Sequence, residues 1–335
     1  MNFLENIFER LRREPSRPVL HEVRDGRVVG ATADELLALI RQGRSFARAS
    51  GLKKGDRCAL LAPNSIRWAA LDLALMAEGV LVVPLYSRQA PKELAAMVRD
   101  SGAALVCCAD AALRDALTRE LTQPPRIALF EEVFATKDDG IGESPVALAG
   151  ADPVTIIYTS GTSGDAKGVV LTVGNISHML KCTTQRLDAL VGSARPQPDR
   201  VFHYLPFNFA GSWILLLSCL SRNSVLTLST DLAKLADEMR LAAPEYSLNV
   251  PALLERVKKG IKEQIEKRGG VARALFTRGK AAWFRQQEGK AEVLDGLWLS
   301  LARGFVFPAI RGKLSPTLRN LVERYEAATE ARVAN

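Results

Sequence analysis

The chain has 335 residues, of which 47% are hydrophobic and 24% are charged. This balance permits a large buried core and excludes an intrinsically disordered chain. The formal net charge of +8 is spread along the chain without a dense block of lysine and arginine, so nucleic acid is not predicted as a partner.

Cysteine spacing and the longest apolar stretches bear on the cellular setting. The five cysteines include no Cys-x-x-Cys pair, so neither a zinc site nor a disulfide framework is predicted and no metal ligands are assigned. Glu5 and Glu9 interrupt the apolar residues near the amino terminus, which excludes an ordinary secretory leader. Apolar runs such as Trp213 to Leu217 are too short to span a bilayer. We therefore expect a cytoplasmic protein with reduced cysteines.

Residues 1–133 alternate between apolar runs and amphipathic segments, which predicts a first α/β subdomain. Thr32 and Glu35 form a capping box that opens a helix, and Gly51 is expected to end it. Asn64 is expected to cap the next helix. The remaining elements expected here are strands at 58–61, 80–83 and 104–107, a helix at 65–78 and a helix that begins at Pro91.

Residues 134–152 are rich in Asp, Gly and Pro and lack periodicity, so they are expected to form a surface connection. Residues 153–250 then resume the alternating pattern as a second α/β portion. Its expected strands are 169–172, 201–205 and 225–228, its expected helices are 175–190 and 212–220, Asp231 caps a further helix, and Pro251 opens the next. The fold class expected for the whole is α/β, with largely parallel sheets flanked by helices.

The stretch from Ile156 to Gly168 reads Ile-Ile-Tyr-Thr-Ser-Gly-Thr-Ser-Gly-Asp-Ala-Lys-Gly. Its glycines let the backbone approach an anion, its hydroxyls supply neutral donors, and its lysine supplies a positive charge suited to polyphosphate. The spacing is not that of a Walker A loop. A phosphate-binding loop is predicted from Thr159, Ser160, Gly161, Thr162, Ser163, Gly164, Lys167 and Gly168.

At these residues the chain resembles the AMP-forming adenylating enzymes, which include acyl-CoA synthetases, peptide-synthetase adenylation domains and luciferases. Every position from Ile156 to Lys167 fits that family's phosphate-loop pattern, and the run from Gly51 to Asp56 with the later Asn64 resembles its early helix-to-strand turn. The resemblance implies a partial adenylating-enzyme large domain. It also implies that a carboxylate attacks the α-phosphate of ATP, and that coenzyme A then takes the acyl group.

The same resemblance assigns roles within the loop. Thr159 to Gly164 would hold the β- and γ-phosphates of ATP with Mg²⁺ nearby, and Lys167 would neutralise the departing pyrophosphate. Lys167 and Thr162 are the candidate catalytic residues. ATP, coenzyme A and a carboxylic acid are thus the expected small-molecule partners.

The segment after residue 205 suggests the kind of acid. Phe209 occupies the position at which the family places an aromatic or histidine side chain in its acyl pocket. With Phe207 and Trp213 it would suit an apolar acyl tail, although the same residues would suit an ordinary core. His203 is expected to be a strand histidine with its hydrogen bonds satisfied.

Residues 251–319 are expected to form a helical segment rich in basic and aromatic residues. Between Gly269 and Lys313 the two kinds of side chain alternate, as in interfacial helices on anionic membranes. A helical subdomain with its aromatics packed inside has the same composition, and it is the preferred interpretation. Long-chain acyl-CoA synthetases carry a similar insertion after the equivalent of Val250 and Pro251, so the resemblance implies a long-chain fatty acid.

Residues 320–335 form a divergent tail that does not resemble the glycine-rich strand expected there. The family's Tyr-Gly-x-Thr-Glu and Thr-Gly-Asp motifs and its carboxy-terminal lid domain are not found, so a truncated ligase is expected. Three interpretations stay open: a ligase that needs a complementing chain, a non-catalytic nucleotide- or lipid-binding remnant, and an acyl-AMP ligase that delivers to a carrier protein. Uncovered strand edges would favour self-association.

Overall fold

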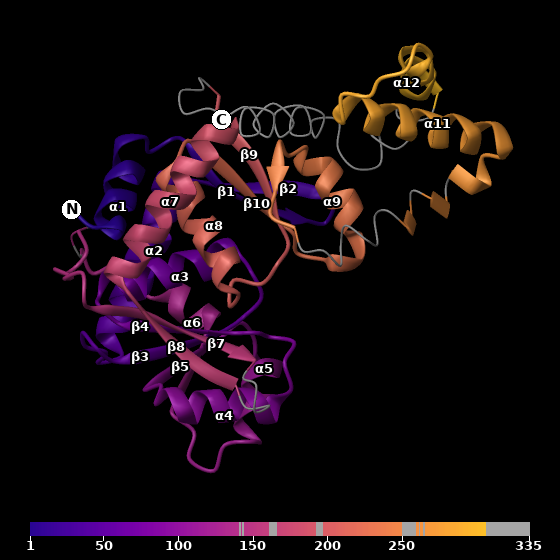
Figure 1. Ribbon diagram of the computed structural model, residues 1–335. Helices are drawn as coiled ribbons and strands as arrows, with labels where there is room; N and C mark the ends of the chain where they lie inside the picture. The colour runs from indigo at the N-terminus through magenta and orange to yellow at the C-terminus, as the bar shows by residue number, and fades with distance from the viewer. Residues whose placement is uncertain are drawn as a thin grey trace. The chain divides into compact units, whose positions relative to one another are not determined.

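The computed structural model describes residues 1–140, 142, 144–160, 166–191, 197–249, 259–260, 262–263 and 265–305. The chain divides into two compact units, Met1–Leu235 and Ala236–Asn335 (Figure 1). Each unit is described by itself. No helix among the described residues is long and apolar enough to cross a membrane.

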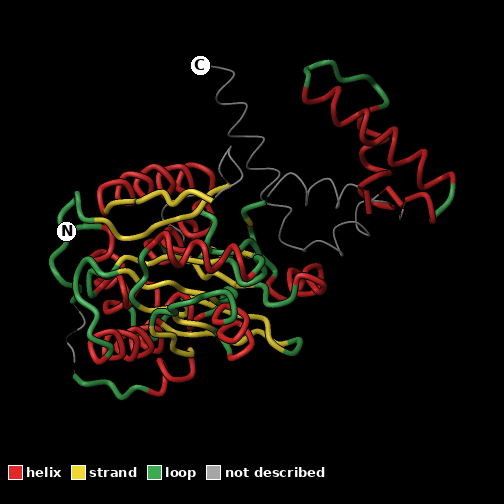
Figure 2. Tube along the Cα trace, turned by 90° about the horizontal axis from the view of Figure 1, so that it is seen from below, coloured by secondary structure: helices red, strands yellow, loops and turns green. Residues whose placement is uncertain are grey.

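A six-stranded sheet forms one half of the first unit (Figure 2). Its strand order is β6-β5-β3-β4-β7-β8, and every neighbouring pair is parallel except β7 with β8. Its strands are β3 (Arg57–Leu61), β4 (Leu81–Leu85), β5 (Leu105–Cys108), β6 (Arg126–Leu129), β7 (Pro153–Ser160) and β8 (Ala166–Thr172).

The second sheet brings together strands from both ends of this unit. Within the unit its order is β9-β10-β1-β2, formed by β9 (Asp199–His203), β10 (Ser224–Leu228), β1 (Pro18–Arg24) and β2 (Arg27–Thr32). β1 pairs parallel with β10 and antiparallel with β2. Asp25 and Gly26, both with positive φ, make the tight turn between β1 and β2, as the right-handed twist of a two-residue hairpin requires.

Helices flank both sheets and lie between them. They are α1 (Phe3–Arg13), α2 (Ala33–Ala49), α3 (Ile66–Ala77), α4 (Pro91–Ser101), α5 (Ala111–Thr118), α6 (Phe130–Ala135), α7 (Val173–Val191) and α8 (Ala210–Ser221). α3 packs against β1 of one sheet and against β3 and β4 of the other, so nearly all its side chains are buried. The predicted α/β class with largely parallel sheets is confirmed.

The capping box at Thr32 and Glu35 is confirmed, but the predicted cap at Asn64 is wrong. The Thr32 amide donates to Glu35 Oε2 at 2.8 Å, and the Glu35 amide donates to Thr32 Oγ1 at 3.3 Å. At the start of α3 the capping side chain is that of Ser65, whose Oγ accepts from the Trp68 amide at 3.0 Å. The Asn64 side chain does not cap the helix, because it forms hydrogen bonds with the loop after β9.

Several element boundaries differ from the expected ones by one or two residues. β4 and β5 begin one residue late, and β9 begins and ends two residues early. Asp231 caps a 3₁₀ turn, η1 (Leu232–Lys234), and α9 (Leu235–Ala242) follows it directly. The sequence pattern alone did not indicate the hairpin of β1 and β2 or helices α1, α5 and α6.

Side chains elsewhere in the first unit bind the connection predicted over 134–152 at several positions. Phe134 belongs to α6, so the irregular chain begins after Ala135. The Arg44 guanidinium donates to the carbonyl of Gly142 at 2.7 Å, and Lys54 Nζ pairs with Asp152 at 2.7 Å. The chain on either side of this connection contributes to both sheets, so the strands of the expected 1–133 and 153–250 portions interleave.

The described part of the second unit is largely helical. After α9 and the two-residue strand β11 (Tyr246–Ser247), α11 (Gly270–Gln287) and α12 (Asp295–Phe305) form a helical hairpin. The helix expected to open at Pro251 and the tail at 320–335 lie outside the described residues. Trp283 and Trp298 are half-buried whereas Phe284 and Phe305 are exposed, so the predicted packing of all aromatics inside is only partly correct.

Candidate functional site

The predicted phosphate loop joins β7 to β8 at the end of an antiparallel pair. In the register of that pair Tyr158 lies opposite Gly168, Thr159 opposite Lys167 and Ser160 opposite Ala166. Thr159, Lys167 and Gly168 are exposed. Gly161, Thr162, Ser163 and Gly164 lie outside the described residues, so the structure describes the two ends of the loop and not its tip.

Gly168 has a packing role that the sequence did not indicate. It lies within β8 instead of in the turn, and a Cβ at this position would come 2.8 Å from Ile156 Cγ2 and 3.2 Å from the Tyr158 ring. Any larger residue would push the Tyr158 ring away. The glycine thus allows close approach between neighbouring strands at the base of the loop.

Tyr158 fastens the base of the loop to α4. Its hydroxyl donates to Asp100 Oδ2 at 2.6 Å and lies 3.2 Å from the Met97 carbonyl oxygen. Burial and the neighbouring Asp100 carboxylate raise the pKa of Tyr158 well above its usual value. Tyr158 belongs to the loop pattern, but the sequence indicated no role for it, because its partners lie far away along the chain.

Two neighbouring cavities lie at the carboxyl ends of the parallel strands, and the larger one borders the loop. The larger, of about 580 Å³, is bordered by Tyr158, Thr159 and Ala166 from the base of the loop and by Tyr86 and Asn208. The smaller, of about 260 Å³, shares Tyr86 and Asn208 and is bordered by segments that follow β3, β4, β9 and β10. Ligands of open α/β sheets bind at this edge. The cavities therefore form the candidate site.

Asn64 links two of the segments around the smaller cavity. Its side-chain nitrogen donates to the Leu205 carbonyl at 2.7 Å, and its side-chain oxygen accepts from the Phe207 amide at 2.9 Å. The loops after β3 and β9 are thereby held together. Charged groups also border this cavity: Arg24 pairs with the buried Glu22 at 2.5 Å, and Arg88 lies on the loop after β4.

The three candidate acyl-pocket residues occupy different environments. Phe207 is buried, borders the smaller cavity and packs on the rings of Trp68 and His203, with centroids 4.9 Å and 5.5 Å away. Trp213 is buried in α8 and borders none of these cavities. Phe209 is 51% exposed at the start of α8. Of the three, the structure therefore brings only Phe207 to the smaller cavity, which adjoins the cavity beside the loop.

His203 is a strand histidine, as expected, but its hydrogen bonds are not satisfied as expected. Within the described residues neither ring nitrogen makes a hydrogen bond of normal geometry, and only a weak interaction with the backbone of Leu205 favours the charged ring. Burial lowers the pKa of His203 to about 4. The ring is therefore neutral at physiological pH, and its contact with Phe207 is an apolar one.

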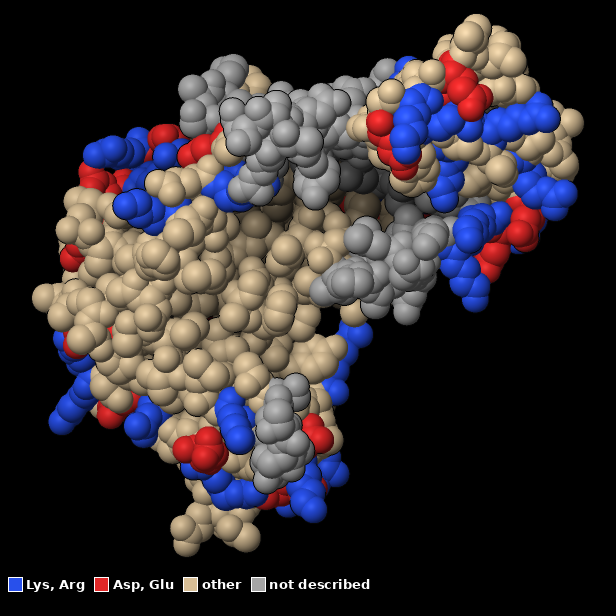
Figure 3. Space-filling view, viewed as in Figure 1, with Lys and Arg blue, Asp and Glu red and all other residues tan. Residues whose placement is uncertain are grey.

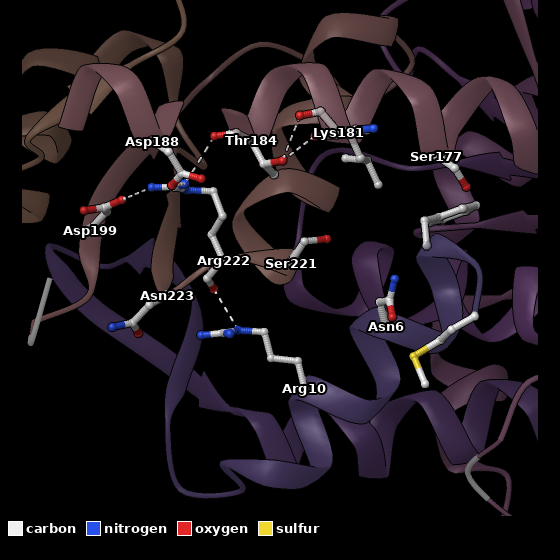
Figure 4. Close-up of a pocket in the computed structure, with 13 residues that line it drawn as sticks. Asn6, Arg10, Ser177, Lys181, Thr184, Asp188, Asp199, Ser221, Arg222 and Asn223 are labelled. Atoms are coloured by element: carbon white, nitrogen blue, oxygen red, sulfur yellow. Dashed lines mark hydrogen bonds and ion pairs between the residues drawn. The ribbon is translucent and has the colours of Figure 1, made fainter. Parts of the chain in front are cut away.

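A third cavity, of about 640 Å³, lies at the opposite ends of β9 and β10 (Figure 4). Its centre is Arg222, whose guanidinium pairs with Asp188 and, at 3.1 Å, with Asp199. Arg10 donates from Nε to the Arg222 carbonyl at 3.1 Å. None of the predicted site residues borders this cavity. Since two carboxylates already balance Arg222, the cluster joins α1, α7 and β9 as a structural element.

No group of three or more His, Cys, Asp and Glu side chains that could hold a metal ion occurs in the part of the chain that the structure describes. Hydroxyl oxygens and phosphates are suitable ligands for Mg²⁺, which usually keeps several waters.

Comparisons with known proteins agree with this geometry. A family model described as AMP-binding enzyme matches residues 7–302. Long-chain-fatty-acid–CoA ligase FadD15 of Mycobacterium bovis is 24% identical over 271 residues, which is 76% of this chain and 44% of that protein. The chloroplastic long-chain-fatty-acid–[acyl-carrier-protein] ligase AEE15 of Arabidopsis thaliana is 26% identical, over 65% of this chain and 33% of its own length.

Solved structures show the same fold. The N-terminal domain of FACL13 from Mycobacterium tuberculosis superposes with a TM-score of 0.63 at 24% identity, covering 76% of this chain and 64% of that one. VinN in complex with L-aspartate gives a TM-score of 0.67 at 19% identity, covering 79% and 66%. The chain spans less than half the length of the curated relatives described above. Because the family model matches most of its residues, the chain belongs to the AMP-binding enzyme family.

Proposed function

We propose that this chain supplies the ATP-binding part of an AMP-forming ligase that activates a long-chain fatty acid. The observation that carries the proposal is the strand pair β7–β8, which presents both ends of the hydroxyl- and glycine-rich loop beside a cavity of about 580 Å³. Thr159 and Lys167 are opposite each other in that pair, and both are exposed. They are therefore free to face a phosphate.

The proposed reaction has two halves. A carboxylate oxygen of the fatty acid bonds to the α-phosphorus of ATP, and the bond to pyrophosphate breaks. The coenzyme A thiol then bonds to the acyl carbon, AMP leaves, and the thiol proton passes to solvent. The loop residues Thr159 to Gly164 and Gly168 would bind phosphate oxygens through hydroxyl and amide groups. Thr162 and Lys167 would stabilise the charge that develops on the leaving pyrophosphate.

Mg²⁺ would supply further neutralisation of the polyphosphate when bound. The hydroxyl-rich loop fits a cation that arrives with ATP, because such a cation takes most of its ligands from phosphate and water. The protein's own contribution in this proposal is to position the phosphates. Positioning and charge stabilisation are the main sources of catalysis in such transfers.

The substrate class rests on the relatives and on the apolar side chains near the site. FadD15 is described as a ligase of long-chain fatty acids, and Phe207 borders the smaller cavity. We include Phe209 and Trp213 in the proposed acyl-binding region, with Phe209 the better placed because it is exposed. The description of AEE15 supports an alternative in which a carrier protein, instead of coenzyme A, accepts the acyl group.

The proposal also concerns place and partners. It sets the reaction in the cytoplasm, at a membrane surface that supplies the fatty acid. Self-association or a complementing chain is proposed as well, since no strand among the described residues pairs with the outer edge of β8. Val169 and Val170 on that strand are 45% and 52% exposed, and uncovered edges of this kind invite pairing.

Formation of acyl-AMP and pyrophosphate from ATP, Mg²⁺ and palmitate by the purified chain tests the proposal. The Lys167→Ala variant should lower the rate at least about tenfold, since it removes a charged hydrogen bond to the phosphates. Lys137→Ala, which changes another exposed lysine, should leave the rate unchanged. Product formed equally by the Lys167→Ala variant would contradict the assigned role. ATP binding without product would favour the non-catalytic nucleotide-binding alternative.

A further inference from the structure

The hairpin of α11 and α12 is held together by its own contacts. Gly279 allows α12 to approach so closely that a Cβ at this position would come 2.5 Å from the Ala302 Cβ. Arg285 pairs with Asp295 through two hydrogen bonds across the turn. Leu299 and Ala302 are buried against α11. One side of α12 is therefore fully used in forming the hairpin.

Another side of α12 carries an apolar stripe. Leu297, Leu301 and Phe305 recur at intervals of four residues, so they share one side of α12, and Leu294 directly precedes the helix. Leu301 is half-buried. Leu294, Leu297 and Phe305 are 58%, 54% and 72% exposed. Adjacent large apolar side chains exposed in this way mark an interaction surface, whereas single exposed ones do not.

The charge of the hairpin indicates what this surface meets. From Gly270 to Phe305 there are six basic residues (Arg273, Arg278, Lys280, Arg285, Lys290 and Arg303) and three acidic ones (Glu288, Glu292 and Asp295), so the net charge is +3. Figure 3 shows the basic side chains gathered over these two helices. The acidic residues pair with Arg285 and Lys290. The other four cations have no acidic partner within the described residues.

One of these cations lies at the border of the stripe. The Arg278 guanidinium is 4.4 Å from the centre of the Trp298 ring, and Trp298 lies one helical turn from Leu294 and from Leu301. A long basic side chain beside an aromatic and a leucine stripe can keep its charge at the polar boundary while the apolar groups enter lipid. Tryptophan itself is favoured at such a boundary.

We propose that the α11–α12 hairpin docks on the surface of an anionic membrane through Leu294, Leu297, Leu301 and Phe305. The exposed stripe would enter the boundary between headgroups and acyl chains, and the four unbalanced cations would meet acidic headgroups. A second copy is a poorer occupant, because apposing two stripes would bring two hairpins of charge +3 together. The inference rests on the membrane-surface location included in the proposed function and names the segment that makes the contact, although docking itself requires neither ATP nor turnover.

Co-sedimentation of the full chain with lipid vesicles tests the inference. Vesicles of equal parts phosphatidylcholine and phosphatidylglycerol should bind the chain, pure phosphatidylcholine should bind it weakly, and added salt should release it. The triple variant Leu294→Ser, Leu297→Ser, Phe305→Ser should lower partitioning about a thousandfold, because each lost apolar anchor is worth about tenfold. These side chains are exposed, so the variant should keep the native circular dichroism spectrum.

Two matched controls sharpen the result. Leu241→Ser changes an exposed leucine outside the hairpin and should leave binding intact. Arg278→Gln should weaken binding to the acidic vesicles, whereas Lys290→Gln, whose lysine already pairs with Glu288, should change it little. Equal binding by the triple variant would overturn the proposal. So would loss of self-association, instead of loss of vesicle binding, when the stripe is changed. Adenylation activity is not part of this readout, so the two proposals can fail separately.

Discussion

Asp72 on α3 lies wholly inside the first unit, where its carboxylate accepts a hydrogen bond from the Trp213 indole nitrogen at 2.8 Å. Burial raises the pKa of Asp72 to about 7, and the hydrogen bond from Trp213 opposes this only in part. A buried carboxyl with a single neutral donor is costly when ionised. Ionisation of this residue therefore makes the stability of the fold depend on pH.

Stability should fall as pH rises from about 4 to about 7, because the unfolded chain releases the Asp72 proton first while the folded chain retains it. The contribution is on the order of 4 kcal/mol and is complete above the folded pKa of about 7. Asp72→Asn keeps an oxygen acceptor for Trp213 and removes the ionisation. The variant should therefore be more stable than the parent at about pH 8 and similar to it at about pH 4.

Urea denaturation at several pH values, followed by circular dichroism, measures this difference. Other titrating groups affect both proteins equally, so the difference between the two pH profiles isolates Asp72. A constant gap between parent and variant over the whole range would show that Asp72 does not titrate in this window.

At the scale of elements, the residues after β3 show that a local preference for helix capping can be overridden by hydrogen bonds to a distant segment. Asparagine is a good helix cap, and its position before α3 predicts that role for Asn64. In the structure Ser65 caps α3, and Asn64 joins the Leu205 carbonyl to the Phe207 amide. The sequence contains no local sign of this bridge, because its partners lie more than a hundred residues further along the chain.

Asn64→Ala and Ser65→Ala should therefore have different effects. Loss of the two Asn64 hydrogen bonds should cost about 2 kcal/mol of unfolding free energy, and loss of the Ser65 cap about 1 kcal/mol. Amide hydrogen exchange separates the two: the Phe207 amide should exchange faster only in Asn64→Ala, and the Trp68 amide only in Ser65→Ala. Faster exchange at Trp68 in both variants would mean that Asn64 supports the cap after all.

Strong local signals were sufficient for many elements. The capping box at Thr32 and Glu35 and the alternation of apolar strands with helices correctly predicted α2, α3 and the central strands. The hairpin of β1 and β2 was missed, although Asp25-Gly26 is a strong turn signal, because Val28 and Val29 on β2 are exposed and weaken the alternation. The pairing of β1 with β10 joins distant segments and has no local signature.

At the scale of the whole molecule, the sequence correctly predicted the fold class and the family, whereas the assignment of the phosphate site to the loop stays a prediction. The loop string is local, so it could be identified from residues alone. The cavities are made by segments after four different strands, and only the fold brings these together. The different burial of Phe207, Phe209 and Trp213 could not be predicted for the same reason. A sequence rich in aromatic residues has the same composition whether its side chains are buried or exposed.

ATP binding by the loop between β7 and β8 is the property on which the proposed function most directly depends. Isothermal titration of ATP and Mg²⁺ into the parent chain, Lys167→Ala and Lys137→Ala measures this. Lys167 is exposed, so its substitution should not unfold the chain, and it should weaken ATP binding about tenfold or more through loss of one charged hydrogen bond. Lys137→Ala should bind like the parent. Equal affinity in all three proteins would remove Lys167 from the phosphate site and contradict the account.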